Sequence, residues 1–454
     1  MFPNPQDALP LPRRPNVERY RKLAKELVNA CHSNEPDAIA DWSEKWIMRL
    51  VKESGIKLTR KTGRGVQHWI DEVTEFATRK LRSDEVTHCR LADAQLVLAE
   101  SHGFQTWTGL IRHMNGLNTK SSKTATFEAA ADAIVAGDIK TLKRLLETDP
   151  ALVRVRSQHE HRATLLHYVS ANGVEGYRQR TPRNIVKITK LLLDAGAEVD
   201  AEADVYGGGA TALGLAATSV HPYRAGVQNE LIQILLDHGA EIDHRTSGGN
   251  QQSAVWGCLA NGRGEAAAYL ADRGAQLTFA TAAGVGKLDV FKQYFGRSGK
   301  PKRNISRKDL EQAFRLACAY GRTEVVKFLL QQGFNLHGCD RTGQTPLHSA
   351  AIGGQLEVIK LLLKFKPPLE LKNMYGGTVL GQTLWSAAHG GDTELYSAII
   401  ETLIEAGAKV PERHVPVNKR IDDLLRRYGS VPEPSWYWYG EKPLRQKKKK
   451  SDRH

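Results

Sequence analysis

Two histidines, His159 and His161, are the side chains of this sequence that most readily suggest metal chemistry. Imidazoles one residue apart can both face a transition metal, and even a catalytic zinc site takes three protein ligands. The pair falls in a short predicted loop, and no third ligand follows it at a recognisable spacing. We therefore predict that these histidines bind no metal, and we expect no cofactor.

A second polar group, His68, Asp71, Glu72 and Glu75, would support acid–base catalysis if its side chains converged. Their spacing fits the polar face of one helix equally well. The chain has no H-E-x-x-H, G-x-S-x-G or Walker sequence, and 206–209 (Y-G-G-G) lacks the G-K-[ST] ending of a phosphate loop. We predict that the protein is not an enzyme, and we keep a site in this helical region as the least favoured alternative.

The element that must position His159 and His161 is a repeating helical unit, seen most clearly at Asp340–Leu371. Gly343 suits a tight turn, and Thr345-Pro346 begins a helix because Thr is a good cap and Pro lacks an N–H that would have no partner there. Gly354 ends that helix, and a second apolar helix follows. Such a unit buries its faces only against neighbours, so the pattern predicts a stack.

This unit resembles the ankyrin repeat, and weaker copies recur along the chain at the 33-residue ankyrin period, as from Gly321 to Gly354 (354 − 321 = 33). The resemblance implies an all-α solenoid of about eight helix-turn-helix units with hairpin fingers. The first helix of the clearest copy begins with the sequence T-P-L-H at 345–348, and its counterpart at 164–167 also ends in histidine. The resemblance implies that these histidines, His348 and His167, bond to the backbone of a neighbouring repeat. We expect the following residues to be structural for the repeats: Thr164, His167, Gly173, Gly196, Thr211, Gly239, Gly262, Gly274, Gly321, Gly333, Thr345, Pro346, His348, Gly354 and Gly407.

A second resemblance covers both ends of residues 17–117. The early R-K-L-A-K-E-L-V and the later L-A-D-A-Q run that ends in Phe104, Trp107 and Leu110 resemble a helical module that precedes ankyrin repeats in many bacterial proteins. Thr106 stands where that family usually has Ser, and either residue can cap a helix. The resemblance implies a bacterial ankyrin-repeat protein with a helical N-terminal module, and it attaches no reaction or ligand.

These patterns divide the chain into six parts. A short helix predicted at Ile421–Arg427 would cap the open end of the stack, as solenoids require. The predicted parts are an extended Pro-rich N-terminus at 1–16, the helical module at 17–117, a linker at 118–125, the ankyrin solenoid at 126–409, a cap with an aromatic segment at 410–440 and a basic disordered tail at 441–454.

Three repeats carry predicted insertions between their two helices, at 174–184, at 219–228 and from about 381 to 394, through Trp385 and His389. Tyr and Arg are enriched in interface hot spots, and insertions in repeats often mark a binding face. Two successive insertions would present their residues from one surface. We therefore predict that Tyr177, Arg178, Tyr223 and Arg224 contact a partner. In the alternative, the loops fold back over the helix ends and the tyrosines pack there.

The net charge of +14 is densest in a basic run at 442–453, which has seven Lys and Arg residues and one Asp, while the rest of the chain is mildly basic. This tail is either a solvated end, a contact for nucleic acid or, in a cell with a nucleus, an import signal. The aromatic segment 436–439 either packs on the last repeat, stacks on single-stranded bases or docks a protein. No apolar run is long enough to span a membrane. The cysteines show no C-x-x-C pair, which favours reduced thiols, with Cys258 and Cys318 buried in helices: Cys31, Cys89, Cys258, Cys318 and Cys339.

The sequence as a whole predicts a non-enzymatic scaffold that holds an unidentified protein partner on its repeat surface. We expect a cytoplasmic monomer without membrane contact. The alternative is a nucleic-acid-associated protein that uses the tail between Trp436 and Lys450.

Overall fold

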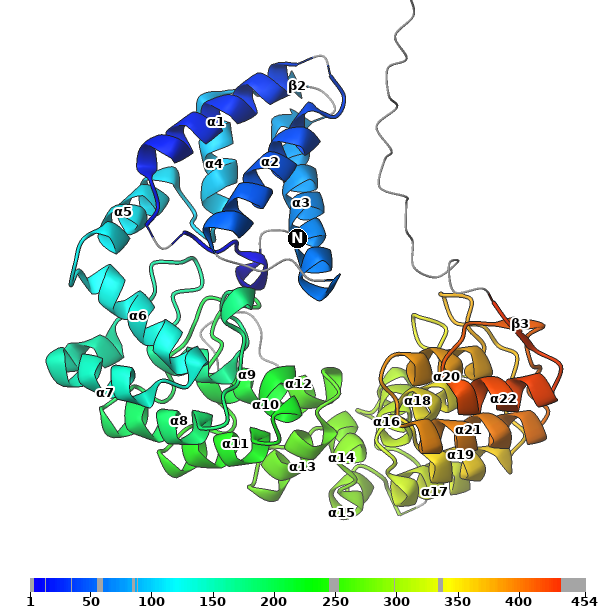
Figure 1. Ribbon diagram of the computed structural model, residues 1–454. Coiled ribbons are helices and arrows are strands. Elements are labelled where there is room, and N and C mark those ends of the chain that lie inside the picture. The colour runs from blue at the N-terminus through cyan, green and yellow to red at the C-terminus, as the bar shows by residue number, and fades with distance from the viewer. Residues whose placement is uncertain are drawn as a thin grey trace, which may run out of the picture. The chain divides into compact units, whose positions relative to one another are not determined.

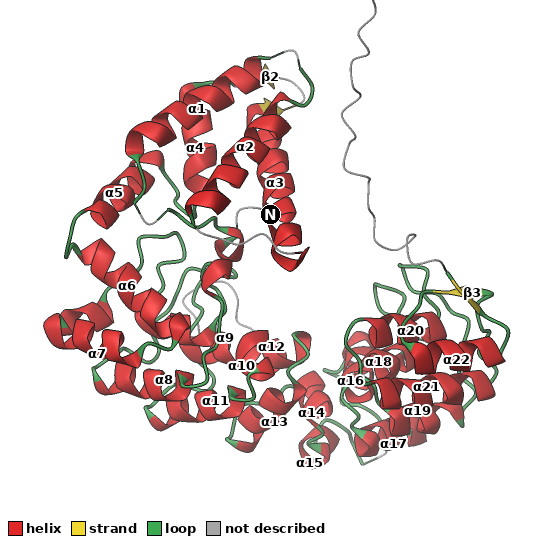
Figure 2. Cartoon of the chain, in the orientation of Figure 1, coloured by secondary structure: helices red, strands yellow, loops and turns green. Residues whose placement is uncertain are grey.

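The computed structural model describes residues 4–12, 14–33, 35–54, 60–83, 86–87, 89–244, 253–297, 299–333 and 338–433. The regular secondary structure of this part of the chain is helical apart from two short strand pairs and a few isolated bridges, and loops connect the helices (Figure 2). It separates into two compact units, Met1–Ala275 and Gln276–His454. The predicted all-α ankyrin solenoid is therefore the observed fold class.

The first unit begins with five α-helices that share a hydrophobic core of their own (Figure 1). Trp42 contributes to that core and donates its indole N–H to the Leu23 carbonyl at 3.2 Å. Phe104 and Leu110 are buried in the core and Trp107 packs against it. The elements are α1 (Val17–His32), α2 (Ala38–Glu53), α3 (Arg60–Leu81), α4 (Leu91–Ser101) and α5 (Trp107–Asn118), with the antiparallel strands β1 (Arg82–Ser83) and β2 (Val86–Thr87).

Cys31 and Cys89 form a disulfide in this helical region, with their Cα atoms 5.9 Å apart. The expectation that all the cysteines are reduced thiols is therefore wrong for this pair. Sequence spacing gave no sign of this disulfide because the two cysteines are 58 positions apart in the chain. Cys258 and Cys318 are buried in helices, and burial raises the pKa of the Cys258 thiol to about 12.

The rest of the first unit consists of helix pairs stacked in repeats. A hydroxyl side chain caps the first helix of several repeats and fixes where that helix begins. Thr211 accepts the N–H of Gly214 at 3.3 Å, and Ser253 accepts the N–H of Trp256 at 3.2 Å. The α-helices are α6 (Lys123–Ala136), α7 (Ile139–Thr148), α8 (Ile185–Asp194), α9 (Ala212–Thr218), α10 (Val220–Arg224), α11 (Gln228–Asp237), α12 (Ala254–Ala260) and α13 (Gly264–Asp272). Four 3-10 turns complete the unit, namely η1 (Pro5–Asp7), η2 (Pro150–Arg154), η3 (Leu165–Ser170) and η4 (Gly176–Arg178).

The second unit is a stack in which first helices pack beside first helices (Figure 1). One continuous core of buried apolar side chains runs through it and ends on α22. The short helix predicted at Ile421–Arg427 is this α22. The elements are α14 (Phe279–Val285), α15 (Leu288–Lys292), α16 (Arg307–Ala319), α17 (Thr323–Gln331), α18 (Pro346–Ile352), α19 (Leu356–Leu363), α20 (Val379–Ala388), α21 (Thr393–Glu405) and α22 (Lys419–Arg427), with the parallel strands β3 (Arg413–His414) and β4 (Val431–Pro432).

The residues named for the repeats perform local structural tasks. The Nε2 atom of His167 lies 3.2 Å from the Ala210 carbonyl oxygen, and that of His348 lies 3.3 Å from the Gly377 carbonyl oxygen. Thr345 caps α18 in a reciprocal bond with His348. The glycines have positive φ, the left-handed region that a side chain would disfavour: Gly173, Gly196, Gly239, Gly262, Gly274, Gly321, Gly333, Gly354 and Gly407.

Two sequence-based expectations about elements are wrong. The third predicted insertion, from about 381 to 394, is mostly helix: α20 continues to Ala388, and α21 begins at Thr393. The second helix begins 11 residues after the cap in the Thr345 repeat and 15 residues after it in the Thr378 repeat, so α20 is simply about one turn longer. Likewise, the basic, Gly-containing composition of 57–65 favours a connection, but 60–65 belong to α3.

Among the described residues, none of the helices combines the length and the apolar character needed to cross a lipid bilayer.

Candidate functional site

The four residues predicted to contact a partner do not share one accessible surface. Arg178 is only 5% exposed, and Tyr177 beside it is half-buried. Tyr223 is 44% exposed on α10, where the guanidinium of Arg263 lies 4.4 Å from its ring centre. Arg224 is exposed. The prediction is therefore wrong for Arg178, because the first insertion folds back on the chain.

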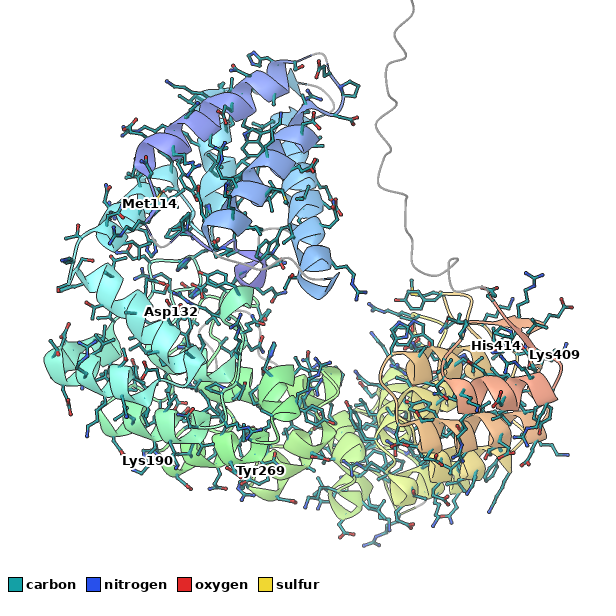
Figure 3. The ribbon with its side chains drawn as sticks, viewed as in Figure 1. Met114, Asp132, Lys190, Tyr269, Lys409 and His414 are labelled. Carbon is teal, nitrogen blue, oxygen red and sulfur yellow. A yellow bond between two sulfur atoms is a disulfide. The ribbon has the colours of Figure 1, made fainter. Side chains whose placement is uncertain are left out.

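Arg178 lies among carboxylates from two elements. Its guanidinium bonds to Glu128 and Asp132 of α6, the latter at 2.8 Å (Figure 3), and lies 3.4 Å from Glu175 of its own insertion. Glu128 and Glu175 are buried, so the arginine neutralises charge that water cannot reach. This side chain holds the insertion against the first repeat and is unavailable to a partner.

Glu175 is fully buried, and potential hydrogen-bond donors lie near one of its two carboxylate oxygens, while the other, Oε2, has no hydrogen-bond partner among the described residues. Its Oε1 atom lies 3.1 Å from His159 Nδ1, 3.3 Å from the Tyr168 hydroxyl and 3.5 Å from His161 Nε2. Burial alone would raise the pKa of this carboxyl, but His159 and Arg178 outweigh burial and hold the pKa well below its usual range. Burial lowers the pKa of His159 to about 4, so its ring is neutral at pH 7.

The structure supplies the third potential metal ligand that the sequence did not reveal. His159, His161 and Glu175 offer three ligand atoms within 4.8 Å of one another. Sequence spacing concealed Glu175 because it lies in the insertion, 14 residues after His161 (175 − 161 = 14). The geometry must therefore decide between a metal centre and a hydrogen-bonded carboxylate.

The hydrogen bonds favour the carboxylate. The backbone N–H of Ala163 donates to His161 Nδ1 at 3.1 Å, so the neutral ring carries its proton on Nε2, the atom that faces Glu175. A metal needs a lone pair there. The guanidinium of Arg178 would also repel a cation next to Glu175. We interpret the cluster as a buried carboxylate that orients its donors.

The N-terminal segment closes over this cluster within the first unit. The Leu9 N–H donates to the Ser101 carbonyl at 2.8 Å, and the Glu160 N–H donates to the Gly103 carbonyl at 2.9 Å. At Gly176 a Cβ would come within 2.2 Å of the Gln6 carbonyl oxygen, so the two backbones touch. The cluster thus connects the N-terminal helices to the first repeats, which is a structural task.

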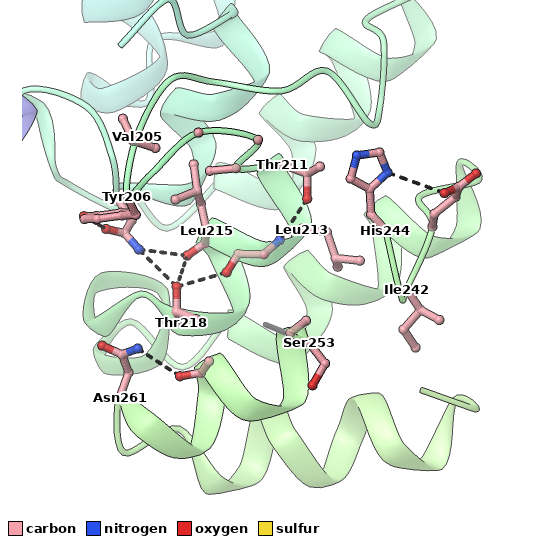
Figure 4. Close-up of a pocket in the computed structure, with 18 of the residues that line it drawn as sticks. Val205, Tyr206, Thr211, Leu213, Leu215, Thr218, Ile242, His244, Ser253 and Asn261 are labelled. Carbon is pink, nitrogen blue, oxygen red and sulfur yellow. Dashed lines mark hydrogen bonds and ion pairs between the residues drawn. The ribbon is translucent and has the colours of Figure 1, made fainter. Parts of the chain in front are cut away.

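A groove of about 460 Å³ opens on the fingers and first helices of the first unit (Figure 4). Its walls come from the finger residues Tyr206 and Thr211, and its floor includes Ala254 and Gly257 of α12. The neighbouring segment 245–252 lies outside the described residues. Val205, Leu213 and Leu215 give the groove apolar surface, and Asn172, Thr218, His244 and Asn261 give it polar groups.

Hydrogen bonds fix the walls of this groove. The Tyr206 hydroxyl donates to Asn172 Oδ1 at 2.7 Å, and Asn172 in turn donates to Thr218 Oγ1 at 3.1 Å. His244 Nε2 lies 2.9 Å from Glu202 Oε1. Tyr206 has a φ of 54° and is 52% exposed, a strained position for an aromatic residue. The segment 206–209, whose sequence lacks the ending of a phosphate loop, therefore carries a hydrogen-bonded aromatic side chain.

The polar group considered for acid–base chemistry lies along α3. Glu72 and Glu75 border a hollow that Asp7 and Arg79 also line, and His68 Nδ1 lies 3.9 Å from Glu72 Oε1. His68 is 62% exposed, as on an ordinary polar helix face. Asp71 is bonded to Gln67 at 2.9 Å and does not line that hollow. The arrangement shows no activated nucleophile or oriented base among the described residues.

Comparison with known proteins gives matches over the repeats. The family model described as "Ankyrin repeats (3 copies)" matches residues 278–373 and 315–414. The "Notch-regulated ankyrin repeat-containing protein" of Xenopus tropicalis is 34% identical over 94 residues, which are 20% of this chain and 79% of that protein. The "Probable 26S proteasome regulatory subunit p28" of Saccharomyces cerevisiae is 30% identical over 148 residues, 32% of this chain and 64% of that one.

Among solved structures, the human ASB11 ankyrin repeat domain aligns with 62% of this chain and 98% of its own at 22% sequence identity. The TM-score of 0.32 makes this superposition too loose for any argument about single residues. The relatives named here come from a frog and a yeast. The bacterial origin implied by the N-terminal resemblance therefore stays a prediction.

Proposed function

This chain belongs to the ankyrin-repeat family, and we propose that it is a non-enzymatic scaffold that binds a protein partner on the fingers and first helices of its repeats. The observation that carries the proposal is the groove lined by Tyr206, Thr211 and Asn261. It combines apolar surface with polar groups, as binding sites do. Its walls are held by hydrogen bonds, so a partner would bind with little ordering cost.

The proposal places the partner over Tyr206 rather than over the first insertion. Tyr206 is exposed and held at its hydroxyl, so its ring is a rigid aromatic contact of the kind found in hot spots. Tyr223 and Arg224 remain proposed contacts. Arg178 is not proposed as a contact, because its guanidinium forms ion pairs with Glu128 and Asp132. Assembly as a monomer and a cytoplasmic location likewise stay predictions.

The test fills the groove without removing a contact. Ala254 lines the groove on α12, and Ala254→Trp would occupy it. The matched control is Ala271→Trp on α13, which does not line the groove. Full-length proteins are used for affinity capture from native lysate treated with nuclease. We expect the wild-type protein and the control variant to capture one stoichiometric protein partner, and Ala254→Trp to lose it. If all three proteins capture the same partners, the groove is not the binding site.

The nucleic-acid alternative depends on the tail between Trp436 and Lys450, which lies outside the described residues. It makes a distinct prediction, namely association that weakens steeply with salt and disappears when the tail is removed.

A further inference from the structure

The second unit exposes apolar side chains at equivalent positions of successive repeats. Ile352 of α18 and Trp385 of α20 lie one 33-residue period apart (385 − 352 = 33) and are 37% and 57% exposed. Met374 and Tyr375, on the finger that precedes α20, are 66% and 76% exposed. Large exposed apolar side chains on neighbouring repeats have the composition of an interaction surface.

The packing of the repeats gives these side chains fixed positions. The Met374 N–H donates to the Thr342 carbonyl at 2.8 Å, so the two neighbouring fingers are bonded to each other. First helices α16, α18 and α20 lie side by side. At Gly353 a Cβ would meet the Ala319 carbonyl oxygen at 2.0 Å, which shows how closely α18 approaches α16. The apolar residues therefore belong to one rigid stack.

The same repeats carry exposed positive charge. Arg341 lies in the finger before α18, one 33-residue period before Met374 (374 − 341 = 33), and Lys308, one period earlier (341 − 308 = 33), is the second residue of α16. Lys302, Arg303 and Lys372 are exposed in the fingers of these repeats as well. Within the ranges that the structure describes, none of these five side chains makes an ion pair.

The carboxylates of these first helices and fingers already have partners. Glu311 bonds to Arg307 at 2.9 Å, and Asp340 bonds to Arg315 and accepts the backbone N–H groups of Thr342 and Gln344. Asp309 accepts the N–H of Ser306 at the start of α16. The side chains of Lys308 and Arg341 therefore have no ion-pair partner among the described residues, and their positive charge is available to an acidic partner.

We propose that the first helices and fingers of α16–α20 form a docking surface for an acidic protein segment that carries large apolar anchors. The inference rests on the proposed function, namely that the repeats bind protein, and it adds the chemistry of the partner. Trp385 and Tyr375 would receive the apolar anchors, while Lys308 and Arg341 attract and orient the acidic side chains. The residues of this surface belong to the second unit, and those of the groove at Tyr206 belong to the first.

Two other occupants fit this surface less well. A nucleic acid could place its phosphates on the basic side chains and stack bases on Trp385 and Tyr375, but it would leave the aliphatic side chains of Ile352 and Met374 uncovered. The chain's own tail at 442–453 is basic, so it has the same sign of charge as the fingers. A protein segment with acidic and large apolar side chains would match both the positive charge and the exposed apolar side chains of this surface.

The experiment selects peptides with full-length protein. A random peptide library displayed on phage is selected against the immobilised chain, and enriched peptides are synthesised for anisotropy titrations. We expect sequences rich in Asp and Glu with Leu, Ile or Phe anchors. Trp385→Ala should weaken their binding about tenfold or more, since an exposed aromatic anchor is a hot-spot residue. Lys308→Glu with Arg341→Glu should weaken it further and reduce its dependence on salt.

Matched controls separate the surface from general effects. Tyr428→Ala removes an exposed aromatic residue at the end of α22, and Lys364→Glu reverses an exposed charge at the end of α19; both should bind like wild type. The proposal is overturned if no acidic peptide is enriched, or if Trp385→Ala and the charge reversals leave binding intact. Competition by an oligo-dT strand or by a peptide of residues 434–454 would also overturn it, in favour of nucleic acid or of the tail.

The outcome is independent of the groove test. If Ala254→Trp loses the native partner while no acidic peptide is selected, the proposed function stands and this inference fails. If acidic peptides bind through Trp385 while Ala254→Trp retains every partner, the groove fails instead.

Discussion

At the scale of single residues, the guanidinium of Arg178 shows why the first insertion is structural. It lies among Glu128, Asp132 and Glu175, and both glutamates are buried. A buried pair contributes little net stability as long as it is intact, because desolvation offsets attraction. Removing one partner is costly because it leaves the other charges buried without compensation.

Arg178→Met should therefore lower the free energy of unfolding by about 3–5 kcal/mol. The substitution keeps much of the side-chain volume while Glu128 and Glu175 lose their cation. Urea denaturation followed by circular dichroism measures the change. Arg180→Met is the matched control, since Arg180 is exposed two residues later and should change stability by less than about 0.5 kcal/mol. Equal stability of the two variants would mean that the cluster has no structural role.

Buried histidines should make the protein sensitive to mild acid. Burial lowers the pKa values of His102, His159 and His167 to about 4 from the ordinary 6.5. A lowered pKa in the folded state means that the unfolded chain binds the proton first. The stability from these neutral rings is complete above pH 6.5 and is lost as the pH falls from there towards 4.

Urea titrations at about pH 7.5, 6 and 5 should show the free energy of unfolding falling at each step. His102→Gln should make the decline shallower, because one of the titrating groups is gone. Its ring bonds to the Tyr20 hydroxyl and to the Leu9 carbonyl, so the variant will also be less stable at high pH. A decline that is equally steep in both proteins would show that His102 titrates normally in the folded state.

Much of this residue-scale arrangement was beyond sequence reasoning. His159 and His161 could be identified as a pair, but their partner Glu175 is set by how the insertion folds back. Tyr177 and Arg178 have the composition of a binding surface, and only packing shows that the arginine is buried. The capping threonines and left-handed glycines could be predicted because their roles depend on neighbours in sequence.

At the scale of elements, close contact between first helices depends on residues without side chains. Gly353 has a φ of −76°, which suits any residue, so its role is to let α18 approach the Ala319 carbonyl of α16. Gly381 in α20 differs, because a Cβ there would meet nothing nearer than Thr378 Oγ1 at 3.6 Å. The two glycines make a matched pair.

Gly353→Ala should destabilise the second unit by about 1–3 kcal/mol, since the helices must separate to admit a methyl group. Gly381→Ala should have the opposite sign and stabilise it by up to about 1 kcal/mol, because alanine favours helix over glycine. Thermal unfolding of the two variants beside wild type measures both. If Gly353→Ala is as stable as wild type, the approach of α18 to α16 is not tightly constrained.

Element types followed from the sequence better than element lengths did. The T-P-L-H unit specified α18 and its neighbours because cap, turn and apolar spacing agree. The same pattern around Thr164 gives a 3-10 turn, and the extra residues near Trp385 extend α20 instead of forming a loop. Added residues either lengthen a helix or form a loop, depending on how they pack against the next repeat. The period of the sequence does not show that packing.

At the scale of the whole molecule, the described chain forms two units, and their boundary after Ala275 lies inside the predicted solenoid. The repeat period in the sequence shows where repeats recur, but it does not show which repeats pack together into one compact unit. The N-terminal segment bonds to Ser101 through Leu9 and touches Gly176 through Gln6, so the helical region and the first repeats are held together. The predicted boundaries at 117 and 126 mark a change of pattern and stay predictions as domain limits.

The disulfide offers a test of whether the two units unfold separately. Cys31–Cys89 closes a loop with a sequence separation of 58, which in the chain-entropy account stabilises the first unit by about 4 kcal/mol. Because solenoid repeats contact only their neighbours, the double variant Cys31→Ser/Cys89→Ser should increase amide hydrogen exchange in α1–α4 and leave α16–α21 unchanged. Hydrogen-exchange mass spectrometry at neutral pH resolves the two regions, and Leu425→Ala in α22 should give the reverse pattern because Leu425 is fully buried. An increase spread evenly over both regions would show that the chain unfolds as one cooperative body.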